Sequence, residues 1–314
     1  KGSGADKASI ELTVGASSFW DSPVEEQLEQ LRYTISFGQN KQQFEILYES
    51  IAQASMGLPF HTEYENFSKM DSLIQLGYDK TQPILAQPQY FNSEVLKLAR
   101  NLSKTSIYRD WIFGRNAPIR KPQIMDLPSD YLEPSCENLC LVLNQIGEDA
   151  IAKKRLLKEL QTFYDGVEDY EIKAYDNYMH LFFYEKGLSS PVSATRLSDG
   201  TLRYLCLLAI LCNPTPPPLV CIEEPELGLH PDILPSLAKL LEEASERCQL
   251  IFTTHSEVLV DSFTHNPEVV LVAEKYEGET QLERLNAEQL KVWLEEYKSL
   301  GNLWSSGHLG GNRW

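Results

Sequence analysis

One short run constrains this chain more than any other: the apolar residues Leu219-Val220-Cys221-Ile222, followed directly by Glu223-Glu224-Pro225. Four apolar residues that stop at acids and a proline are typical of a buried parallel strand at its carboxyl end. Open α/β sheets bind ligands at that end of their strands. A carboxylate there can hold Mg²⁺, and a second one can orient or deprotonate an attacking water. The run therefore predicts an α/β fold with a site at Glu223 and Glu224.

Two further stretches flank this strand in the sequence. Upstream, Leu197-Ser198-Asp199-Gly200-Thr201 precedes an apolar helical stretch, and serine and glycine at a helix start expose N–H groups that suit a phosphate. An ordinary turn or helix cap is the simpler interpretation of this stretch by itself. Downstream, residues 249–254 form a second buried-strand pattern that ends at His255, where a polar loop residue is the simpler interpretation. The three stretches together favour a nucleotide site.

In this order, the three stretches resemble the motifs of ABC-type ATPases of the RecF/OLD/SMC-like branch. Residues 197–201 resemble the signature motif, residues 219–224 resemble the Walker B strand, and His255 resembles the switch histidine. The sequence Leu-Gly-Leu-His-Pro at residues 227–231 lies where such proteins have the D-loop. The C-terminal residues also resemble the tail of small bacterial predicted "AAA family" ATPases. The resemblance is specific over residues 190–314 and looser before them.

The resemblance implies a fold, cofactors and an assembly. The implied fold is α/β: an ABC-type P-loop NTPase head with a mixed sheet flanked by helices, an antiparallel β meander and a helical insert. The implied cofactors are ATP and Mg²⁺. Heads of this type work as homodimers with ATP sandwiched between them, so that ATP joins two heads and hydrolysis releases them. A separate effector or nuclease subunit would respond to this change.

The resemblance also implies roles for individual residues. It assigns contact with the γ-phosphate held by the opposite subunit to the signature residues Ser198, Asp199, Gly200 and Thr201. Glu223 would help hold Mg²⁺, although aspartate is the usual residue at that position. Glu224 would polarise the attacking water, and His255 would sense the γ-phosphate. Because Pro225 follows Glu224, we expect an extended backbone at Glu224.

One motif of the family is not found in the sequence. The 314 residues contain no Gly-x-x-x-x-Gly-Lys-Ser/Thr loop, which is the phosphate cradle of these proteins. Lys104-Thr105 is the nearest match to this motif, but Leu98 and Ser103 occupy the positions that need glycine. We therefore expect a strand, P-loop and helix upstream of Lys1. A relative without a P-loop is the alternative.

The overall charge limits the partners that a surface of this composition suits. The chain has 28 Lys and Arg against 45 Asp and Glu, so the net charge is 28 − 45 = −17, which argues against a surface coated for nucleic acid. Four cations stand close together in this acidic chain, at Arg109, Arg115, Arg120 and Lys121. A surface loop paired with local acids is one interpretation of them, and a contact with DNA or a partner is the other.

Cysteine usage and hydropathy point to a cytoplasmic protein. The six cysteines contain no Cys-x-x-Cys pair, and three of them lie in apolar segments, so we expect buried reduced thiols. No apolar run approaches the ~18 residues of a membrane span. We therefore expect no membrane partner.

Three regions follow from the patterning. Residues 1–52 alternate as an antiparallel meander, on which Tyr33 would stack on adenine or, more simply, pack in the core. Residues 53–168 are expected to be a mostly helical insert or lid. Within it we expect irregular structure up to residue 90, helices at 93–102, 139–146 and 150–163, and a strand over 111–120. Residues 169–314 are expected to be the C-terminal ATPase lobe, which opens with a hairpin turning at Asp176-Asn177.

Three classes of function remain open. The first is an ATPase that gates DNA processing or a partner effector, as in phage defence or DNA repair. The second is an ATP-binding assembly scaffold with little turnover. The third is a nuclease of the OLD type, which needs an appended Toprim domain. Since residues 285–314 are too few for that domain, we expect any nuclease to be another chain.

Overall fold

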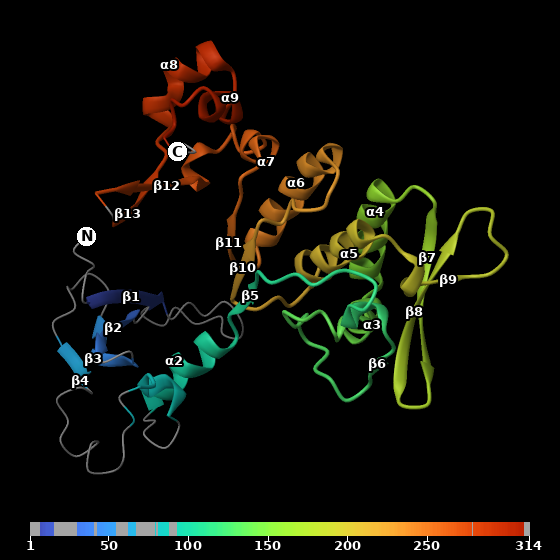
Figure 1. Cartoon of the computed structure of the whole chain (residues 1–314), viewed down its shortest axis with the longest axis horizontal. Coiled ribbons are helices and arrows are strands. Elements are labelled where there is room, and N and C mark those ends of the chain that lie inside the picture. The colour runs from blue at the N-terminus through green and yellow to red at the C-terminus, as the bar shows by residue number, and fades with distance from the viewer. Residues whose placement is uncertain are drawn as a thin grey trace. The chain divides into compact units, whose positions relative to one another are not determined.

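The computed structural model describes residues 7–15, 30–40, 43–54, 62–66, 79, 81–87, 93–277 and 279–310. The chain divides into two compact units, Lys1–Lys104 and Thr105–Trp314, whose elements are labelled in Figure 1. This division differs from the expected regions 1–52, 53–168 and 169–314. The reason is packing, because the helices expected in the insert share one apolar core with the strands at residues 219–223 and 249–253.

The first unit contains an antiparallel sheet with the strand order β1-β2-β3-β4. Its strands are β1 (Lys7–Gly15), β2 (Gln30–Asn40), β3 (Gln43–Ala54) and β4 (Thr62–Asn66). The first three strands confirm the expected meander. Strand β4 lies in the stretch for which irregular structure was expected. A short 3-10 helix, η2 (Ile84–Ala86), and α2 (Ser93–Ser103) complete the described part of this unit, and α2 confirms the helix expected from Ser93.

The second unit is built on a parallel sheet with the order β11-β10-β5. Its strands are β5 (Ser106–Tyr108), β10 (Leu219–Glu223) and β11 (Gln249–Thr253). The strand expected over residues 111–120 is wrong, since the strand lies before it, at β5. Residues 111–120 turn instead, because Gly114 adopts a φ of 148° and Pro118 lacks an N–H. The 3-10 helix η4 (Pro118–Arg120) ends this stretch.

Helices pack on this sheet around α5 (Asp199–Leu211), which is buried at every position from 201 to 211. Leucine is the commonest residue of this run, and apolar residues lie on all sides of the helix, as is typical of a helix inside a protein. Its neighbours are α3 (Leu139–Glu148), α4 (Ala150–Phe163) and α6 (Leu234–Ser245), and Figure 1 shows α5 and α6 beside β10 and β11. The Ser198 side chain caps α5 and Asp149 caps α4.

A second sheet lies at the other side of these helices and leads into the signature motif. It contains β6 (Gln123–Ile124), β7 (Val167–Tyr175), β8 (Tyr178–Glu185) and β9 (Val192–Ser193), all paired antiparallel. The hairpin expected at Asp176 is confirmed, and Asp176 adopts the positive φ, 51°, that such a tight turn requires. The 3-10 helix η5 (Ala194–Arg196) then delivers the chain to Ser198.

The C-terminal part follows β11. It contains α7 (Glu257–Asp261), a hairpin of β12 (Leu271–Tyr276) and β13 (Glu279–Arg284), then α8 (Ala287–Tyr297) and α9 (Leu300–Ser305). Helix α9 packs on α7, where the Gly301 N–H donates to Asp261 Oδ1 at 3.0 Å. A Cβ at position 301 would stand 2.8 Å from the same oxygen, so only glycine allows this approach.

The architecture is therefore mixed α/β, with a parallel sheet flanked by helices, as the sequence predicted. None of the helices in the described ranges has the length and apolarity that crossing a membrane requires. All six cysteines are free, and four of them are buried.

Candidate functional site

The carboxyl ends of β10 and β11 bring two of the predicted site residues together. These strands are parallel and pair Glu223 with Thr253, so the residues that follow them emerge at the same edge of the sheet. The Glu224 N–H extends the ladder by donating to the Thr253 carbonyl at 3.0 Å. His255 Nε2 then lies 3.8 Å from Glu224 Oε1. Glu223 ends β10 with an exposed side chain.

The expectation of an extended backbone at Glu224 is wrong. Glu224 adopts a φ of 44°, the left-handed region that costs a non-glycine residue about 1 kcal/mol or more. Two hydrogen bonds to its carbonyl oxygen hold this conformation: the Leu227 N–H donates at 3.1 Å and Arg203 Nη2 donates at 3.0 Å. These bonds outweigh the local preference that Pro225 imposes. The backbone turns sharply here and carries the Glu224 carboxylate toward His255.

A third carboxylate, Glu226, supports the loop that carries His255. Its Oε1 accepts from Thr254 Oγ1 at 2.6 Å and from the His255 N–H at 3.1 Å. Glu226 therefore ties the loop after β11 to the turn after β10. Sequence reasoning missed this role, although an acid directly after Glu-Glu-Pro and a threonine before the histidine were both visible in the sequence.

The signature residues lie at the start of α5. Ser198 Oγ accepts from the Thr201 N–H at 3.0 Å and lies 2.7 Å from Thr201 Oγ1, so the simpler interpretation of Ser198 as a helix cap describes its contacts here. The first N–H groups of a helix have no partner inside it, and Ser198 and Asp199 are exposed at this end. A Cβ at Gly200 would lie 3.0 Å from the Gly228 carbonyl oxygen. The signature motif thus packs directly on the loop that follows Walker B.

Comparison with known proteins supports this assignment of motifs. Residues 131–261 match the family model described as "AAA domain, putative AbiEii toxin, Type IV TA system". Over these residues the chain is similar to the AAA domains of that family. No curated protein matches the chain.

The chain is also similar to solved structures of SMC heads. An SMC head bound to the C-terminal winged-helix domain of ScpA is similar with a TM-score of 0.51 at 11% identity, over 91% of this chain and 76% of that chain. The SMC head of Pyrococcus furiosus with an extended coiled coil, bound to the C-terminal domain of ScpA, has a TM-score of 0.44 at 12% identity, over 94% of this chain and 81% of that chain. At its identity, the first of these likenesses shows the SMC head fold.

Arg120, which lies in the second unit, serves a purpose that the sequence did not suggest. Its guanidinium donates to the carbonyl oxygens of Thr195 at 3.2 Å and Leu197 at 2.7 Å, and it forms an ion pair with Asp199. Its side chain is only 10% exposed. Arg120 therefore clamps the loop that enters the signature motif. These contacts and its burial favour the interpretation as a residue paired with local acids over a contact with DNA.

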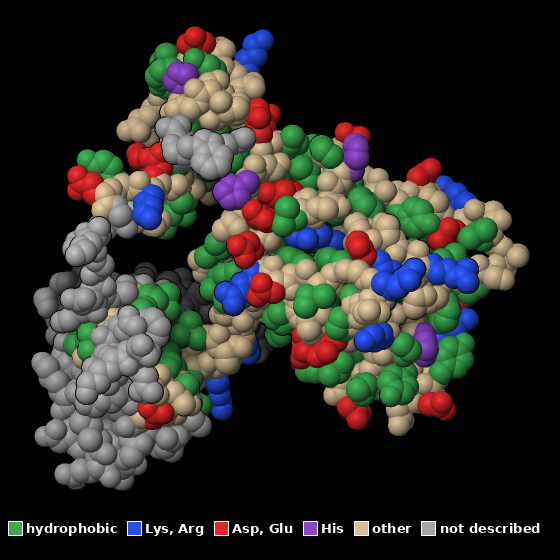
Figure 2. All heavy atoms as spheres, in the orientation of Figure 1, with side chains coloured by type: hydrophobic (Ala, Val, Ile, Leu, Met, Phe, Trp, Pro, Cys, Tyr) green, Lys and Arg blue, Asp and Glu red, His purple; other side chains and the backbone are tan. Residues whose placement is uncertain are grey.

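The other cations of this stretch differ from Arg120. Arg109 pairs with the neighbouring Asp110 at 3.1 Å, and Arg115 and Lys121 are exposed. Figure 2 shows Lys and Arg side chains mixed with Asp and Glu on the face drawn. A DNA or partner contact through Arg109, Arg115 and Lys121 stays a prediction.

Tyr33 lies in the first unit and is 4% exposed. Its hydroxyl donates to Glu49, a fully buried carboxylate that also accepts from the Ile84 N–H at 2.8 Å. This burial favours the interpretation of Tyr33 as a core aromatic over that of a ring that stacks on adenine.

The acids at the strand end fit the Mg²⁺ of a nucleotide complex. Mg²⁺ keeps several waters and is held by one or two carboxylates together with substrate phosphates, so a dedicated cage of protein ligands is not required. The described residues contain no cluster of three or more acidic, histidine or cysteine ligands. Glu223, exposed at the end of β10, is the residue that would approach the ion.

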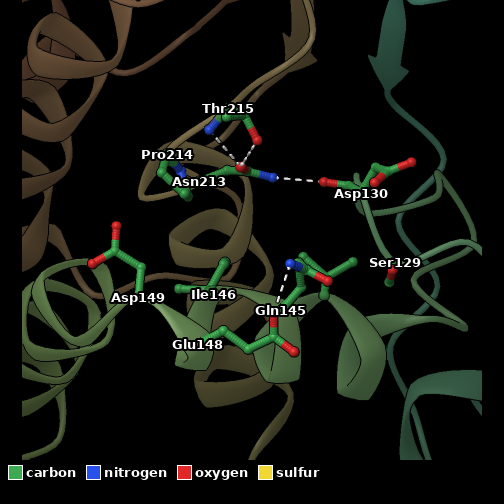
Figure 3. Close-up of a pocket in the computed structure, with 10 residues that line it drawn as sticks. Ser129, Asp130, Gln145, Ile146, Glu148, Asp149, Asn213, Pro214 and Thr215 are labelled. Atoms are coloured by element: carbon green, nitrogen blue, oxygen red, sulfur yellow. Dashed lines mark hydrogen bonds between the residues drawn. The ribbon is translucent and has the colours of Figure 1, made fainter.

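A pocket of about 310 Å³ lies away from these motifs. It is found at the opposite end of α5, between α3 and the loop after Cys212, with Asp130, Glu148, Asp149 and Asn213 among its lining residues. Figure 3 shows Asn213 bridging Thr215 and Asp130 along one wall. None of the predicted site residues lines this pocket, so we do not assign it to the nucleotide.

Proposed function

We propose that this protein binds and hydrolyses ATP and that its heads pair with ATP between them. The observation that carries the proposal is the meeting of Glu224 and His255, 3.8 Å apart at the carboxyl ends of two parallel strands. Glu226 fixes the histidine loop from the same turn. An acid and an imidazole beside an exposed Mg²⁺-side carboxylate form a site for attack of water on a γ-phosphate.

The roles follow from position. Glu224 is the base that polarises the attacking water, and Glu223 is the acid on the metal side. His255 contacts the γ-phosphate. Ser198 and the N–H of Gly200 contact a γ-phosphate held by the opposite head, since they lie at an exposed helix start. The 314 residues contain no Gly-x-x-x-x-Gly-Lys-Ser/Thr loop, so the proposal assigns the phosphate cradle to another segment.

We place that cradle, a P-loop, in a segment outside these 314 residues. Two features of the sheet support this. Within the described ranges β11 pairs on one side only, and a row of apolar side chains crosses one face: Ile107, Cys221 and Ile251. Ile107 is 53% exposed and Ile251 is 49% exposed, whereas parallel sheets are normally covered on both faces. The complete coding sequence tests the idea, and a methionine codon directly before Lys1 contradicts it.

We further propose that ATP-dependent pairing gates DNA processing or a separate effector or nuclease subunit in the cytoplasm, in phage defence or DNA repair. The family description of residues 131–261 refers to a type IV toxin–antitoxin system, and the SMC head of similar fold was solved with a bound domain of ScpA. Both support a head that passes its nucleotide state to another protein.

The alternative is an assembly scaffold with little turnover, and one experiment separates the two. Glu224→Gln keeps the size of the side chain and removes the base, so kcat should fall by ~10²–10⁴-fold while ATP binding and pairing persist. Glu223→Gln should instead weaken Mg²⁺-dependent ATP binding. Steady-state hydrolysis, nucleotide affinity and light scattering with and without ATP are the measurements, with Glu283→Gln on β13 as the control. Hydrolysis by Glu224→Gln at the parental rate favours the scaffold.

A further inference from the structure

Arg203 is the one buried cation among the described residues, with 8% of its surface exposed. Placing a charge inside a protein is costly unless it is paired and hydrogen-bonded. Burial lowers the pKa of Arg203, and the nearby carboxylates of Glu226 and Glu224 oppose that effect. The free-energy cost of burying this cation, directly behind the Walker B acids, indicates that Arg203 does more than pack in the core.

The contacts of Arg203 connect two motifs. Its Cα belongs to α5, which begins with the signature motif, and its Nη2 donates to the Glu224 carbonyl at 3.0 Å. The guanidinium carbon lies 5.1 Å from the Trp111 ring centroid and 5.8 Å from that of Phe113. These rings stack on each other and hold the planar group in one orientation. The side chain is thus a short rigid connection from α5 to the turn at Glu224.

Part of the hydrogen-bonding capacity around this turn is unused. Within the described part of the chain, Arg203 Nε and Glu226 Oε2 are buried and have no partner. Buried polar atoms are nearly always paired, so an unpaired donor and an unpaired acceptor beside one turn leave room for a second arrangement. A small shift of α5 relative to this turn would change which oxygen the guanidinium binds.

We infer that Arg203 is a positioning residue that couples the signature helix of each head to Glu224 of the same chain. This inference rests on the proposed function. In paired heads, the signature motif of one chain lies at the nucleotide of its partner, while Glu224 of that chain acts on its own nucleotide. Arg203 therefore connects the two nucleotide sites. When α5 of one chain contacts the nucleotide of the partner, Arg203 positions the backbone and the carboxylate of Glu224 at the nucleotide of its own chain.

The first test compares homodimers of the intact protein. Arg203→Gln should lower kcat about 10-fold, the scale of one lost hydrogen bond plus a small misplacement, with little change in the KM for ATP. It should also remove any cooperativity in ATP, so that the Hill coefficient falls to 1. Arg203→Lys retains a charged donor and should recover most of the rate. Arg247→Ala is the matched control, since this arginine donates to the Leu211 carbonyl at the far end of α5.

The second test uses mixed dimers purified with two affinity tags, in which Glu224→Gln silences one site. When Arg203→Gln and Glu224→Gln are in the same chain, the working site has its own intact Arg203 and should turn over as the Glu224→Gln/parental dimer does. When they are in opposite chains, the working site belongs to the Arg203→Gln chain and should be about 10-fold slower. Equal rates in the two dimers overturn the inference.

Failure of the proposed function gives a different result. If the parental protein with its P-loop neither hydrolyses ATP nor pairs in its presence, the proposed function is wrong. If it does both, and Arg203→Gln lowers only the melting temperature, then the proposed function stands and Arg203 is a structural residue.

Discussion

The two ends of α5 are held by the same chemistry but connect to different parts of the protein. At the N-terminal end, Arg120 and Arg203 donate to main-chain carbonyls and also reach Asp199 and the Glu224 turn. At the C-terminal end, Arg247 donates to the Leu211 carbonyl at 2.6 Å and Asn213 to the Asp130 carbonyl at 2.8 Å. Since only the first set of contacts reaches the motifs, substitutions there should change turnover, and substitutions at the other end should change stability alone.

Among substitutions at the two ends of α5, the largest effect is expected at Gly200, at the N-terminal end. A Cβ there would lie 3.0 Å from the Gly228 carbonyl, so Gly200→Val must push the signature motif away from the Gly228 loop. We expect kcat/KM for ATP to fall ~100-fold, the cost of a displacement approaching 1 Å in a catalytic site, with a small change in melting temperature. Gly147→Val is the control, because its nearest neighbour is Tyr170 Oη at 3.7 Å. Equal losses in both variants would remove the distinction between the two ends.

Arg120→Ala should have the next largest effect. The substitution frees the Thr195 and Leu197 carbonyls and the Asp199 carboxylate, so the loop that enters the signature motif loses its anchor. We expect kcat/KM to fall about 10-fold, because bonds to a charged group contribute ~1.5–3 kcal/mol and part of that is screened at exposed Asp199. Arg115→Ala, at an exposed position of the same stretch, should leave hydrolysis unchanged. A DNA-binding assay on both variants also tests the remaining DNA interpretation, which requires Arg115 to matter more.

At the C-terminal end, Asn213→Ala should lower stability without slowing hydrolysis. Asn213 is 5% exposed and both ends of its amide are used, toward the Asp130 carbonyl and the Thr215 N–H. Removing it leaves two polar groups without partners, which costs about 1–3 kcal/mol. Denaturant unfolding measures the loss and steady-state kinetics measures turnover, with Asn302→Ala as an exposed control. A fall in kcat with unchanged stability would show that this end also communicates with the site.

The smallest effect at neutral pH is expected at Cys212, the C-cap of α5. Burial raises the pKa of Cys212 to about 12, from an ordinary value of 9.0. Its folded pKa is raised, so the unfolded chain loses this proton first as the pH rises. The contribution of the neutral thiol to the free energy of unfolding is fully present below pH 9. It is lost between pH 9 and about 12, by ~1.4 kcal/mol for each pH unit. Cys212→Ala should therefore flatten the fall of unfolding free energy over that interval, and an unchanged slope would contradict this.

The sequence predicted the parts of the fold that depend on local pattern. Strand β10, the cap at Ser198 and the turn at Asp176 are encoded by residues that lie next to one another, and the structure contains all three. Strand β5 is only three residues long, and its partner lies more than a hundred residues away, so no local period indicates it. The contacts of Arg120 and Arg203 likewise join distant segments, and the positive φ of Glu224 is imposed by those contacts against the preference set by Pro225.

The backbone at Glu224 has a consequence for how this protein can change over evolutionary time. Glycine or asparagine would relieve the left-handed strain at this position, and strain of this kind costs about 1–3 kcal/mol. Neither residue has a carboxylate, so with Glu224 in its proposed role as the base, selection for turnover and selection for stability act in opposite directions at position 224. In a lineage that no longer needs hydrolysis, glutamate should be lost here early, and its replacement should stabilise the fold. The residue found at this one position in each relative is thus a record of whether hydrolysis has remained under selection.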